Sequence, residues 1–242
     1  MRRFAALLVP TLLAAGCGGN STAANDDAPV VLAASSLTEV FQAIDPDAKY
    51  SFAGSDELAS QIQEGAPADV YAAASPKYPM QLNEESLVGE PQIFATNRLV
   101  IVVPSGNPAA IQSAADMAKP GVKVVIGAEG VPIGDYTRTV LETMGREDVL
   151  ENVVSNEDDV KGVLAKVASG DADAGFVYVT DTKAAGDEVE AIELPASAQA
   201  KVGYPITIVT DAAHEEGAQQ FVDLVMGDEG QAKLREAGFG PP

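Results

Sequence analysis

The chain has 242 residues, of which 15 are basic and 36 acidic, so its formal net charge is −21 at pH 7. This composition argues against nucleic-acid binding, because phosphates require a surface rich in Lys and Arg. A chain of this charge also repels anions at long range, so an anionic ligand would have to be held by local dipoles that outweigh the global field. Cys17 is the only cysteine, which excludes internal disulfides from the folded part.

The first residues have the anatomy of an export signal. Arg2 and Arg3 form a short basic region, and an apolar run over residues 4–15 follows. This run is shorter than the roughly 20 residues of a membrane-spanning helix. Because Gly16 and Cys17 stand at the expected cleavage point, residues 1–16 are predicted to be the signal peptide of a lipoprotein. The leucine stands one place further from the cysteine than in the usual lipobox, and the alternative is an ordinary signal with a small core thiol.

Cleavage before Cys17 would leave a lipidated N-terminus. Residues 17–29 are small, polar and acidic, and this composition is typical of a flexible tether. Each lipid methylene buried in a membrane contributes roughly 0.8 kcal/mol of anchoring. We therefore expect an exported, extracytoplasmic protein that is anchored to the membrane by lipid through Cys17.

Apolar runs and amphipathic stretches alternate from residue 30 onward. The predicted strands are residues 30–34, 50–53, 69–73, 99–104, 122–127, 174–179 and 204–210. The predicted helices are residues 37–44, 55–64, 116–118, 135–144, 157–168 and 215–225. This alternation indicates an α/β protein with parallel strands and crossover helices. Both a pair of lobes, with the chain passing back and forth, and a single doubly wound sheet fit the pattern.

Catalytic constellations are scarce. His214 is the only histidine, and it stands at the polar start of a late predicted helix, where a solvated side chain is expected. The sequence contains no Gly-x-Ser-x-Gly elbow, no Walker loop and no His-rich metal cluster. We therefore expect neither an enzyme nor a protein with direct metal ligands, and no cofactor.

Four junctions place hydroxyl or free backbone N–H groups where a helix begins, at the carboxyl edge of a sheet. They are residues 33–38, 52–58, 131–136 and 156–160. Helix N-termini bind anions without a formal positive charge, and ligands of α/β proteins generally lie at this sheet edge. The alternative is that Ser36, Ser55 and Asn156 are ordinary N-caps.

Eight segments along the chain carry a family resemblance. They are Ala-Ala-Ser-Ser-Leu-Thr at residues 33–38, Phe-Ala-Gly-Ser at 52–55, Gln-Ile-Gln-Glu-Gly-Ala-Pro-Ala-Asp-Val at 61–70, Val-Pro-Ile-Gly-Asp-Tyr at 131–136, Glu-Asp-Asp-Val-Lys-Gly-Val-Leu at 157–164, Gly-Phe-Val-Tyr at 175–178, Tyr-Pro-Ile at 204–206 and Ala-Gly-Phe at 237–239. In this order they resemble the molybdate-binding proteins of bacterial ABC importers, over nearly the whole mature chain.

The resemblance implies a two-lobed type II periplasmic-binding-protein fold, with two mixed sheets and a hinge between the lobes. Lobe 1 would contain residues 30–100 and 205–242, and lobe 2 would contain residues 101–204. The implied function is capture of a tetrahedral oxyanion, molybdate or tungstate, for delivery to an ABC permease. The implied protein is a monomer, and sulfate or phosphate is the alternative ligand.

Five residues match the family's ligand-binding positions. Ser36 and Ser55 would give hydroxyl and backbone N–H contacts, Ile133 and Val160 would give backbone N–H groups, and Tyr178 would give its phenol O–H. All are neutral donors, and hydrogen bonds to an ionised acceptor are stronger than neutral ones. Tyr178 shares a strand face with Phe176, so a packing role is also expected for it.

The sequence departs from the family after Ser55. The family often continues with Ser or Thr, whereas Asp56 and Glu57 follow here. A carboxylate facing a dianion weakens binding, so we expect both side chains to point outward and to support the helix N-terminus.

Overall fold

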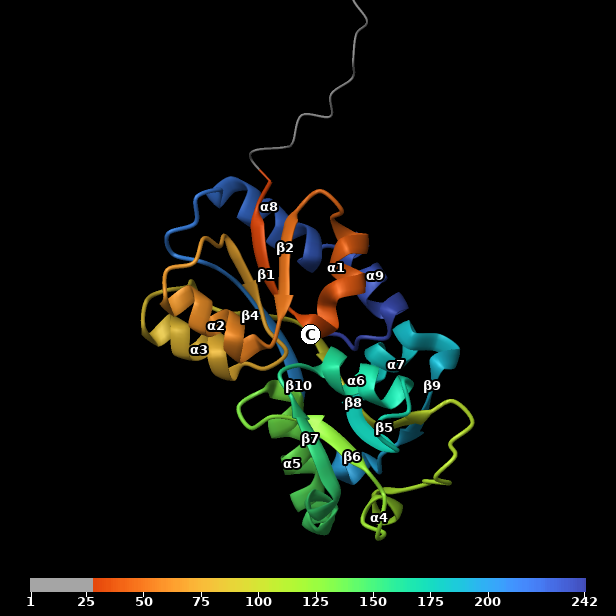
Figure 1. Cartoon of the computed structure of the whole chain (residues 1–242). Helices are drawn as coiled ribbons and strands as arrows, with labels where there is room; N and C mark the ends of the chain where they lie inside the picture. Colours follow the sequence, from red (N-terminus) through yellow and green to blue (C-terminus); the bar gives the residue numbers. More distant parts are fainter. Residues whose placement is uncertain (1–27) are drawn as a thin grey trace, which may run out of the picture.

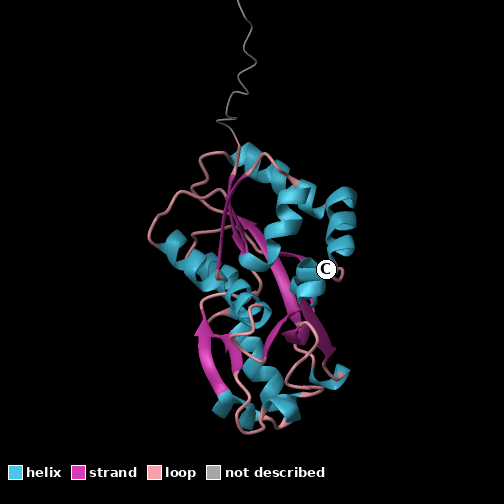
Figure 2. Ribbon diagram, turned by 45° about the vertical axis from the view of Figure 1, so that its right-hand side comes forward, coloured by secondary structure: helices cyan, strands magenta, loops and turns pink. Residues whose placement is uncertain are grey.

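The computed structural model describes residues 28–242, which form two α/β lobes around two five-stranded sheets (Figures 1 and 2). The expected export signal, the lipidation site Cys17 and all of the tether except residues 28 and 29 lie outside the described residues. No helix within residues 28–242 is both long and apolar enough to cross a membrane.

The first sheet has the strand order β2-β1-β3-β10-β4. Its strands are β1 (Val30–Ala34), β2 (Lys49–Ala53), β3 (Val70–Ala72), β4 (Gln92–Asn97) and β10 (Val202–Ile208). β1 is parallel to β2 and β3, whereas β10 is antiparallel to β3 and β4, so the sheet is mixed.

Helices cover both faces of the first sheet. They are α1 (Thr38–Ile44), α2 (Ser55–Gln63), α3 (Lys77–Glu84), α8 (Glu215–Met226) and α9 (Asp228–Ala237). Alternate residues of β1 are buried in different clusters, because successive side chains of a strand point to opposite faces. Val31 packs in the cluster that contains Phe41 of α1 and Phe221 of α8, and Leu32 packs in the one that contains Leu58 of α2.

The second sheet has the strand order β7-β6-β8-β5-β9. Its strands are β5 (Leu99–Pro104), β6 (Val124–Gly127), β7 (Val153–Glu157), β8 (Ala174–Tyr178) and β9 (Val189–Glu193). β6 is parallel to β7 and β8, and β5 is antiparallel to β8 and β9. The helices of this lobe are α4 (Ala114–Met117), α5 (Pro132–Met144), α6 (Val160–Ala168) and α7 (Val179–Ala185).

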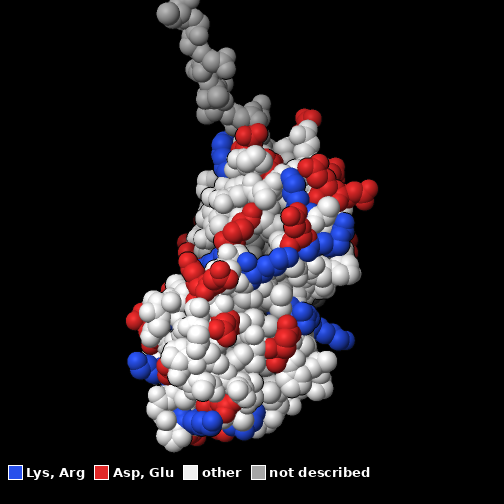
Figure 3. Space-filling view, turned by 90° about the vertical axis from the view of Figure 1, so that its right-hand side faces the viewer, with Lys and Arg blue, Asp and Glu red and all other residues white. Residues whose placement is uncertain are grey.

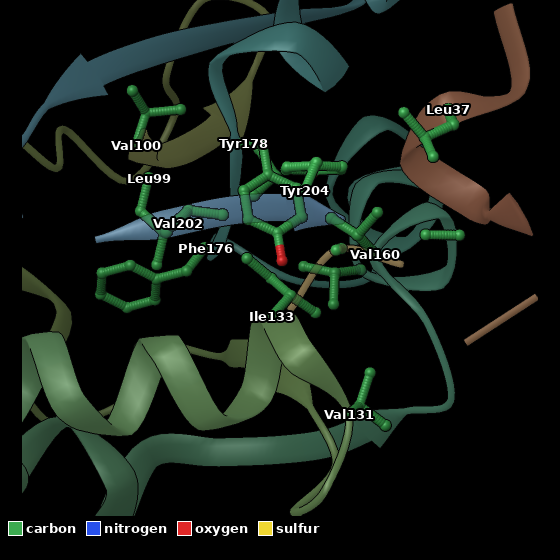
Figure 4. Packing of buried hydrophobic residues seen from close by; sticks show 14 of the residues in the cluster. Leu37, Leu99, Val100, Val131, Ile133, Val160, Phe176, Tyr178, Val202 and Tyr204 are labelled. Atoms are coloured by element: carbon green, nitrogen blue, oxygen red, sulfur yellow. The ribbon is translucent and has the colours of Figure 1, made fainter. Parts of the chain in front are cut away.

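The chain crosses between the lobes at two places. Only Arg98 separates β4 of the first sheet from β5 of the second, and the return runs from β9 to β10. The largest buried cluster contains residues of both sheets, among them Leu99, Tyr178 and Tyr204, so the core is continuous beside the crossings (Figure 4). The prediction of two α/β lobes is confirmed, and the single doubly wound sheet is wrong.

Three strands escaped prediction: β4, β7 and β9. Each is an edge strand of its sheet. Edge strands have one free side and expose many of their residues, so they lack the continuous apolar runs of buried strands. In β7 and β9, for example, nine of the ten residues are exposed or partly exposed, and each strand contains glutamate.

Candidate functional site

A small cavity lies between the lobes, at the carboxyl ends of the parallel strands. Its lining comes from both sheets and from the helix starts that follow their strands. The lining residues are Ala34, Ser35, Ser36, Ala53, Gly54, Ser55, Ala74, Val131, Pro132, Ile133, Asp159, Val160 and Tyr178. The structure therefore brings all five residues carried over from the family resemblance into one cavity.

Ser55 is the first residue of α2, and its hydroxyl does not cap that helix. The N-cap is Gly54, and it makes no side-chain cap bond. The Ser55 Oγ instead accepts a hydrogen bond of 3.1 Å from the backbone N–H of Ala74, and the Ser55 carbonyl accepts one of 2.6 Å from the Tyr71 hydroxyl. Ser55 is thus held by β3 and its continuation, and the interpretation of Ser55 as an ordinary N-cap is wrong.

Ser36 lies in a short 3-10 helix, Ser35–Leu37, directly after β1. Its side chain is buried and makes no cap bond with this helix. The Ser36 Oγ lies 3.0 Å from the Tyr204 hydroxyl of β10. Ser36 is therefore also not an ordinary N-cap.

The second lobe supplies two helix N-termini. α5 begins with Pro132 after the N-cap Val131, without a side-chain cap, so its first N–H groups are left for another acceptor. Ile133 follows Pro132 in this first turn. Gly134 allows α5 to approach β6, because a Cβ there would clash with the carbonyl oxygens of Gly127 and Ala128.

α6 begins at Val160, and Asp159 is its N-cap. The Asp159 Oδ1 accepts a hydrogen bond of 2.8 Å from Gly162 N–H. Asn156 lies within β7, so its interpretation as an N-cap is wrong. The predicted helix over residues 157–168 began too early because the acidic run 157–159 belongs to the end of β7 and the turn that follows it.

Tyr178 ends β8 and is 1% exposed. Its ring packs edge-on against Tyr204, with ring centroids 5.8 Å apart (Figure 4). Its hydroxyl lines the cavity, is buried, and has no hydrogen-bond partner among the described residues. Burial raises the pKa of the Tyr178 phenol well above its ordinary value, so the group stays protonated and able to donate. Both expected roles, packing and cavity lining, meet in this residue.

Among the described residues, no basic side chain lines the cavity, and Asp159 is the one charged residue in its lining. Any attraction for an anion therefore comes from neutral hydroxyl and N–H donors and from helix dipoles. The wider surface remains acidic: the face in Figure 3 carries acidic side chains over both lobes.

Asp56 differs from the expectation, whereas Glu57 is exposed as predicted. Asp56 is half-buried, and its buried Oδ1 has no hydrogen-bond partner in the described part of the chain. Burial raises the pKa of Asp56, with a further contribution from the carboxylates of Asp158 and Asp135. Asp56 is therefore not solvent-facing as expected, because the start of α2 lies against Asp158 of the other lobe, but its position outside the cavity lining agrees with the expectation.

His214 lies away from the cavity and is not simply solvated. It is the N-cap of α8, and its Nδ1 lies 2.9 Å from the Asp69 Oδ2. Its backbone N–H donates to the Asp69 Oδ1 at 2.9 Å. The sequence-based expectation missed this partner because Asp69 is 145 residues away in the chain.

Sequence reasoning also missed lining residues, of which Ala74 is the most informative. Its N–H fixes the Ser55 hydroxyl, and it follows β3. The place of Ala74 at the cavity could have been predicted, because it follows the predicted strand β3 and the carboxyl ends of parallel strands meet at one edge of a sheet.

Within residues 28–242, no group of three or more His, Cys, Asp or Glu residues is arranged to hold a metal ion. Residues 30–240 match the family described as bacterial extracellular solute-binding protein. The chain belongs to this family. A molybdate-binding protein of Mycobacterium tuberculosis is 37% identical, over 97% of this chain and 97% of its own length. The resemblance to molybdate-binding proteins is therefore confirmed along nearly the whole chain.

Two further comparisons extend this family assignment. A putative ABC transporter substrate-binding lipoprotein of Bacillus subtilis is 28% identical, over 98% of this chain and 96% of its own length. The solved periplasmic molybdate-binding protein of Azotobacter vinelandii superposes with a TM-score of 0.77 at 23% identity, covering 88% of this chain and 99% of that chain. This likeness shows the fold. The relatives are binding proteins rather than enzymes, in agreement with the expectation for this solute-binding protein.

Proposed function

We propose that this solute-binding protein captures a tetrahedral oxyanion, molybdate by preference or else tungstate, and delivers it to an ABC permease. The observation that carries the proposal is the Tyr178 hydroxyl, which is buried, unpartnered among the described residues and turned to the cavity. A buried donor without an acceptor costs about 1–3 kcal/mol, and a bound anion removes this cost. The similarity to molybdate-binding relatives supports the choice of anion.

Five residues would hold the anion. Ser36 and Ser55 give hydroxyl and backbone N–H donors from lobe 1, and Tyr178 gives its phenol from lobe 2. Ile133 and Val160 give backbone N–H groups from the first turns of α5 and α6. Dipoles fixed in a dry cavity interact strongly with an ionised acceptor, which offsets the repulsion from the acidic surface.

Closure of the two lobes over the ligand completes the site. We assign the first sheet to lobe 1 and the second sheet to lobe 2, with the hinge at the crossing strands. The predicted bounds, residues 30–100 and 205–242 for lobe 1 and 101–204 for lobe 2, shift by two or three residues, because β5 begins at Leu99 and β10 at Val202. The lobes make direct contacts near the cavity, including a hydrogen bond of 2.6 Å from the Tyr78 hydroxyl to the Gly130 carbonyl. Because the ligand binds groups of both lobes, it stabilises the closed arrangement over the open one.

Calorimetric titration of the purified protein with molybdate, tungstate, sulfate and phosphate tests this proposal. Molybdate and tungstate are expected to bind, with sulfate and phosphate much weaker. Ser55→Ala should weaken molybdate binding by about 1–3 kcal/mol through loss of a charge-assisted hydrogen bond. Binding of sulfate or phosphate alone would overturn the choice of anion, and an unchanged affinity of Ser55→Ala would remove Ser55 from the site.

The protein is further proposed to act as a monomer at the outer face of a membrane, anchored by a lipid on Cys17 after removal of residues 1–16. The lipoprotein name of the Bacillus subtilis relative supports this anchor. Mass spectrometry of the protein from membranes should find a diacylglyceryl-modified Cys17 at the N-terminus. Cys17→Ser should release the protein from the membrane without changing its affinity for molybdate, and a soluble wild type would contradict the anchor.

A further inference from the structure

Two buried polar side chains lie behind Ser36 and do not line the cavity. Tyr204 of β10 is fully buried, and Asn97 at the end of β4 is 6% exposed. The Tyr204 hydroxyl lies 3.0 Å from the Ser36 Oγ and 3.5 Å from the Asn97 Nδ2. Both residues stand on the strands that cross between the lobes.

The direction of these hydrogen bonds follows from the Asn97 amide. Its Oδ1 accepts a hydrogen bond of 2.9 Å from the backbone N–H of Arg98, which can only donate. The Nδ2 therefore faces the Thr180 Oγ1 at 3.0 Å and the Tyr204 hydroxyl. Because an amide nitrogen donates and does not accept, the Tyr204 oxygen is the acceptor in this contact.

Among the described residues, the Ser36 Oγ is the one acceptor within hydrogen-bond distance of the Tyr204 hydroxyl, so the arrangement that leaves no buried donor unpaired directs the single hydrogen of Tyr204 to Ser36. Burial raises the pKa of the Tyr204 phenol well above its ordinary value, so this hydrogen is present at neutral pH. Ser36 accepts from Tyr204, and its own hydrogen remains free for the cavity, which Ser36 lines. The chain of donors thus runs from Asn97 through Tyr204 to Ser36.

The Ser55 hydroxyl is also oriented as a hydrogen-bond donor toward the cavity, by a different group of the protein. Its Oγ accepts the hydrogen bond from Ala74 N–H, so its hydrogen is also free for the cavity. Both serine hydroxyls therefore have their acceptor side engaged by the protein. At each serine one acceptor position is already taken by the protein, so a ligand that carries an O–H group is bound less well there than an oxyanion that only accepts.

We propose that Tyr204, oriented by Asn97, is a positioning residue that fixes Ser36 as a hydrogen-bond donor and so favours fully deprotonated oxyanions over hydrogen phosphate. This inference rests on the proposed function, and it adds two residues that never touch the ligand. Removing the Tyr204 hydroxyl frees the acceptor side of Ser36. Its hydroxyl then rotates, binds a dianion less well and accepts from a protonated oxyanion.

A double-mutant cycle separates action through Ser36 from a general structural effect. Tyr204→Phe should weaken molybdate binding about tenfold, the scale of one hydrogen bond to a charged group. In a Ser36→Ala background the same substitution should have no further effect. In a Ser55→Ala background its effect should remain about tenfold. Calorimetric titration measures the affinities of the wild type, the three single variants and the two double variants.

Selectivity gives a second readout that a loss of packing does not reproduce. The ratio of the molybdate affinity to the hydrogen phosphate affinity should fall in Tyr204→Phe. Tyr50→Phe is the matched control, since the Tyr50 hydroxyl donates to the carbonyls of Phe41 and Asp45 in the same lobe and away from the cavity. It should keep both the affinity and the ratio of the wild type.

If Tyr204→Phe does not fold, Asn97→Ala replaces it in the same double-mutant cycle. Loss of the Asn97 amide donor lets the Tyr204 oxygen accept a hydrogen bond from Ser36. Additive effects of either substitution with Ser36→Ala, in a protein that binds molybdate, would overturn the role of Tyr204 while leaving the proposed function intact. A wild type that binds none of the tested oxyanions would overturn the proposed function and this inference together.

Discussion

Ser36, Ser55 and Tyr178 are three of the hydroxyl-bearing residues that line the cavity, and they differ in what surrounds their oxygen atoms. The Ser36 and Ser55 oxygens contact protein hydroxyl or N–H groups, whereas the Tyr178 hydroxyl has no hydrogen-bond partner in residues 28–242. The ligand-free protein therefore bears a desolvation cost at Tyr178 that binding of an acceptor removes. Because of this difference, removal of the Tyr178 hydroxyl should affect ligand binding without lowering the stability of the ligand-free protein.

Tyr178→Phe should weaken molybdate binding about tenfold or more, because a donor to the anion is lost. It should not lower the free energy of unfolding of the ligand-free protein, because no hydrogen bond to a described residue is lost. Tyr71→Phe provides the contrast, since the Tyr71 hydroxyl donates to the Ser55 carbonyl and its loss should lower stability. Calorimetry and urea unfolding measure the two effects. Full affinity in Tyr178→Phe would place the ligand elsewhere.

Asp181 gives the protein a pH-dependent stability. It is 1% exposed, and its Oδ2 accepts a hydrogen bond of 3.0 Å from Tyr178 N–H. Burial raises the pKa of Asp181 to about 7, although Lys161 and the Tyr178 N–H act in the opposite direction. A raised pKa means that the folded state holds the proton more tightly than the unfolded state.

The wild-type free energy of unfolding should therefore decrease as the pH rises from about 4, the unfolded pKa, to about 7, the folded one. Asp181→Asn imitates the protonated carboxyl and should remove this decrease. Urea unfolding of both proteins across this range makes the comparison. Parallel pH profiles of the two proteins would show that Asp181 does not titrate in this window.

The predicted residues of the cavity lining were open to prediction because they follow predicted strands in local motifs. Ser36, Ser55 and Val160 each stand where a strand gives way to a helix, so the sequence alone locates them. Asn97 and the Ala74 N–H were not, because their partners Tyr204 and Ser55 are 107 and 19 residues away and the contacts exist only after folding. The sequence therefore indicates which groups reach the ligand, and the fold decides how they are oriented.

At the scale of whole elements, buried strands were predictable, whereas three of the four edge strands were not. β5, with five of its six residues buried, was predicted with its observed bounds. β9, with one buried residue of five, was missed. The missed helices α3, α7 and α9 are short, at 8, 7 and 10 residues, and their positions depend on packing against neighbouring elements. Periodicity reports burial, and these elements bury too little for a clear pattern.

Asp69 joins the starts of two elements of the first lobe. Its carboxylate accepts hydrogen bonds from Val30 N–H at the start of β1, at 2.7 Å, and from His214 N–H at the start of α8, at 2.9 Å. Burial acts to raise the pKa of Asp69, but these bonds and the His214 side chain outweigh it and hold the pKa below its ordinary value. The ionised carboxylate is thus the form that stabilises the fold.

Asp69→Asn should lower the free energy of unfolding at neutral pH by about 2 kcal/mol, because an amide cannot accept from all of these donors. The wild type should lose the same contribution as the pH falls below about 4, where the carboxylate takes up a proton, and the variant should not. Urea unfolding at neutral and acid pH tests both points. Molybdate affinity should be unchanged, since Asp69 does not line the cavity. A variant as stable as the wild type would contradict the role of Asp69.

For the whole molecule, the lobes meet closely around the cavity. Ion pairs join Lys77 to Asp135 at 3.1 Å and Lys161 to Glu39 at 2.7 Å, each across the two lobes. Both pairs are partly exposed, so each contributes little to stability by itself. Gly54 approaches the Asp158 carbonyl of the other lobe closely, since a Cβ on residue 54 would lie 2.5 Å from that oxygen.

Gly54→Ala should therefore hinder closure without unfolding either lobe. Gly54 has a φ of −60° and a ψ of 141°, which alanine adopts without strain, so the stability of the ligand-free protein should be nearly unchanged. If the closed population falls about tenfold, the apparent molybdate affinity falls by the same factor. Calorimetry gives the affinity, and small-angle X-ray scattering gives the decrease in radius of gyration on ligand addition, which should be smaller in the variant.

Gly89→Ala is the matched control for this substitution. It lies in the same lobe, and its added Cβ would meet its nearest neighbours, the Ile208 carbonyl and the Thr207 hydroxyl, at 3.6 Å, an ordinary contact distance. It should bind molybdate and contract like the wild type. Wild-type affinity and contraction in Gly54→Ala would mean that the bound state does not need the close approach of residue 54 to Asp158. Binding would then depend on the donors of each lobe without the contact between them.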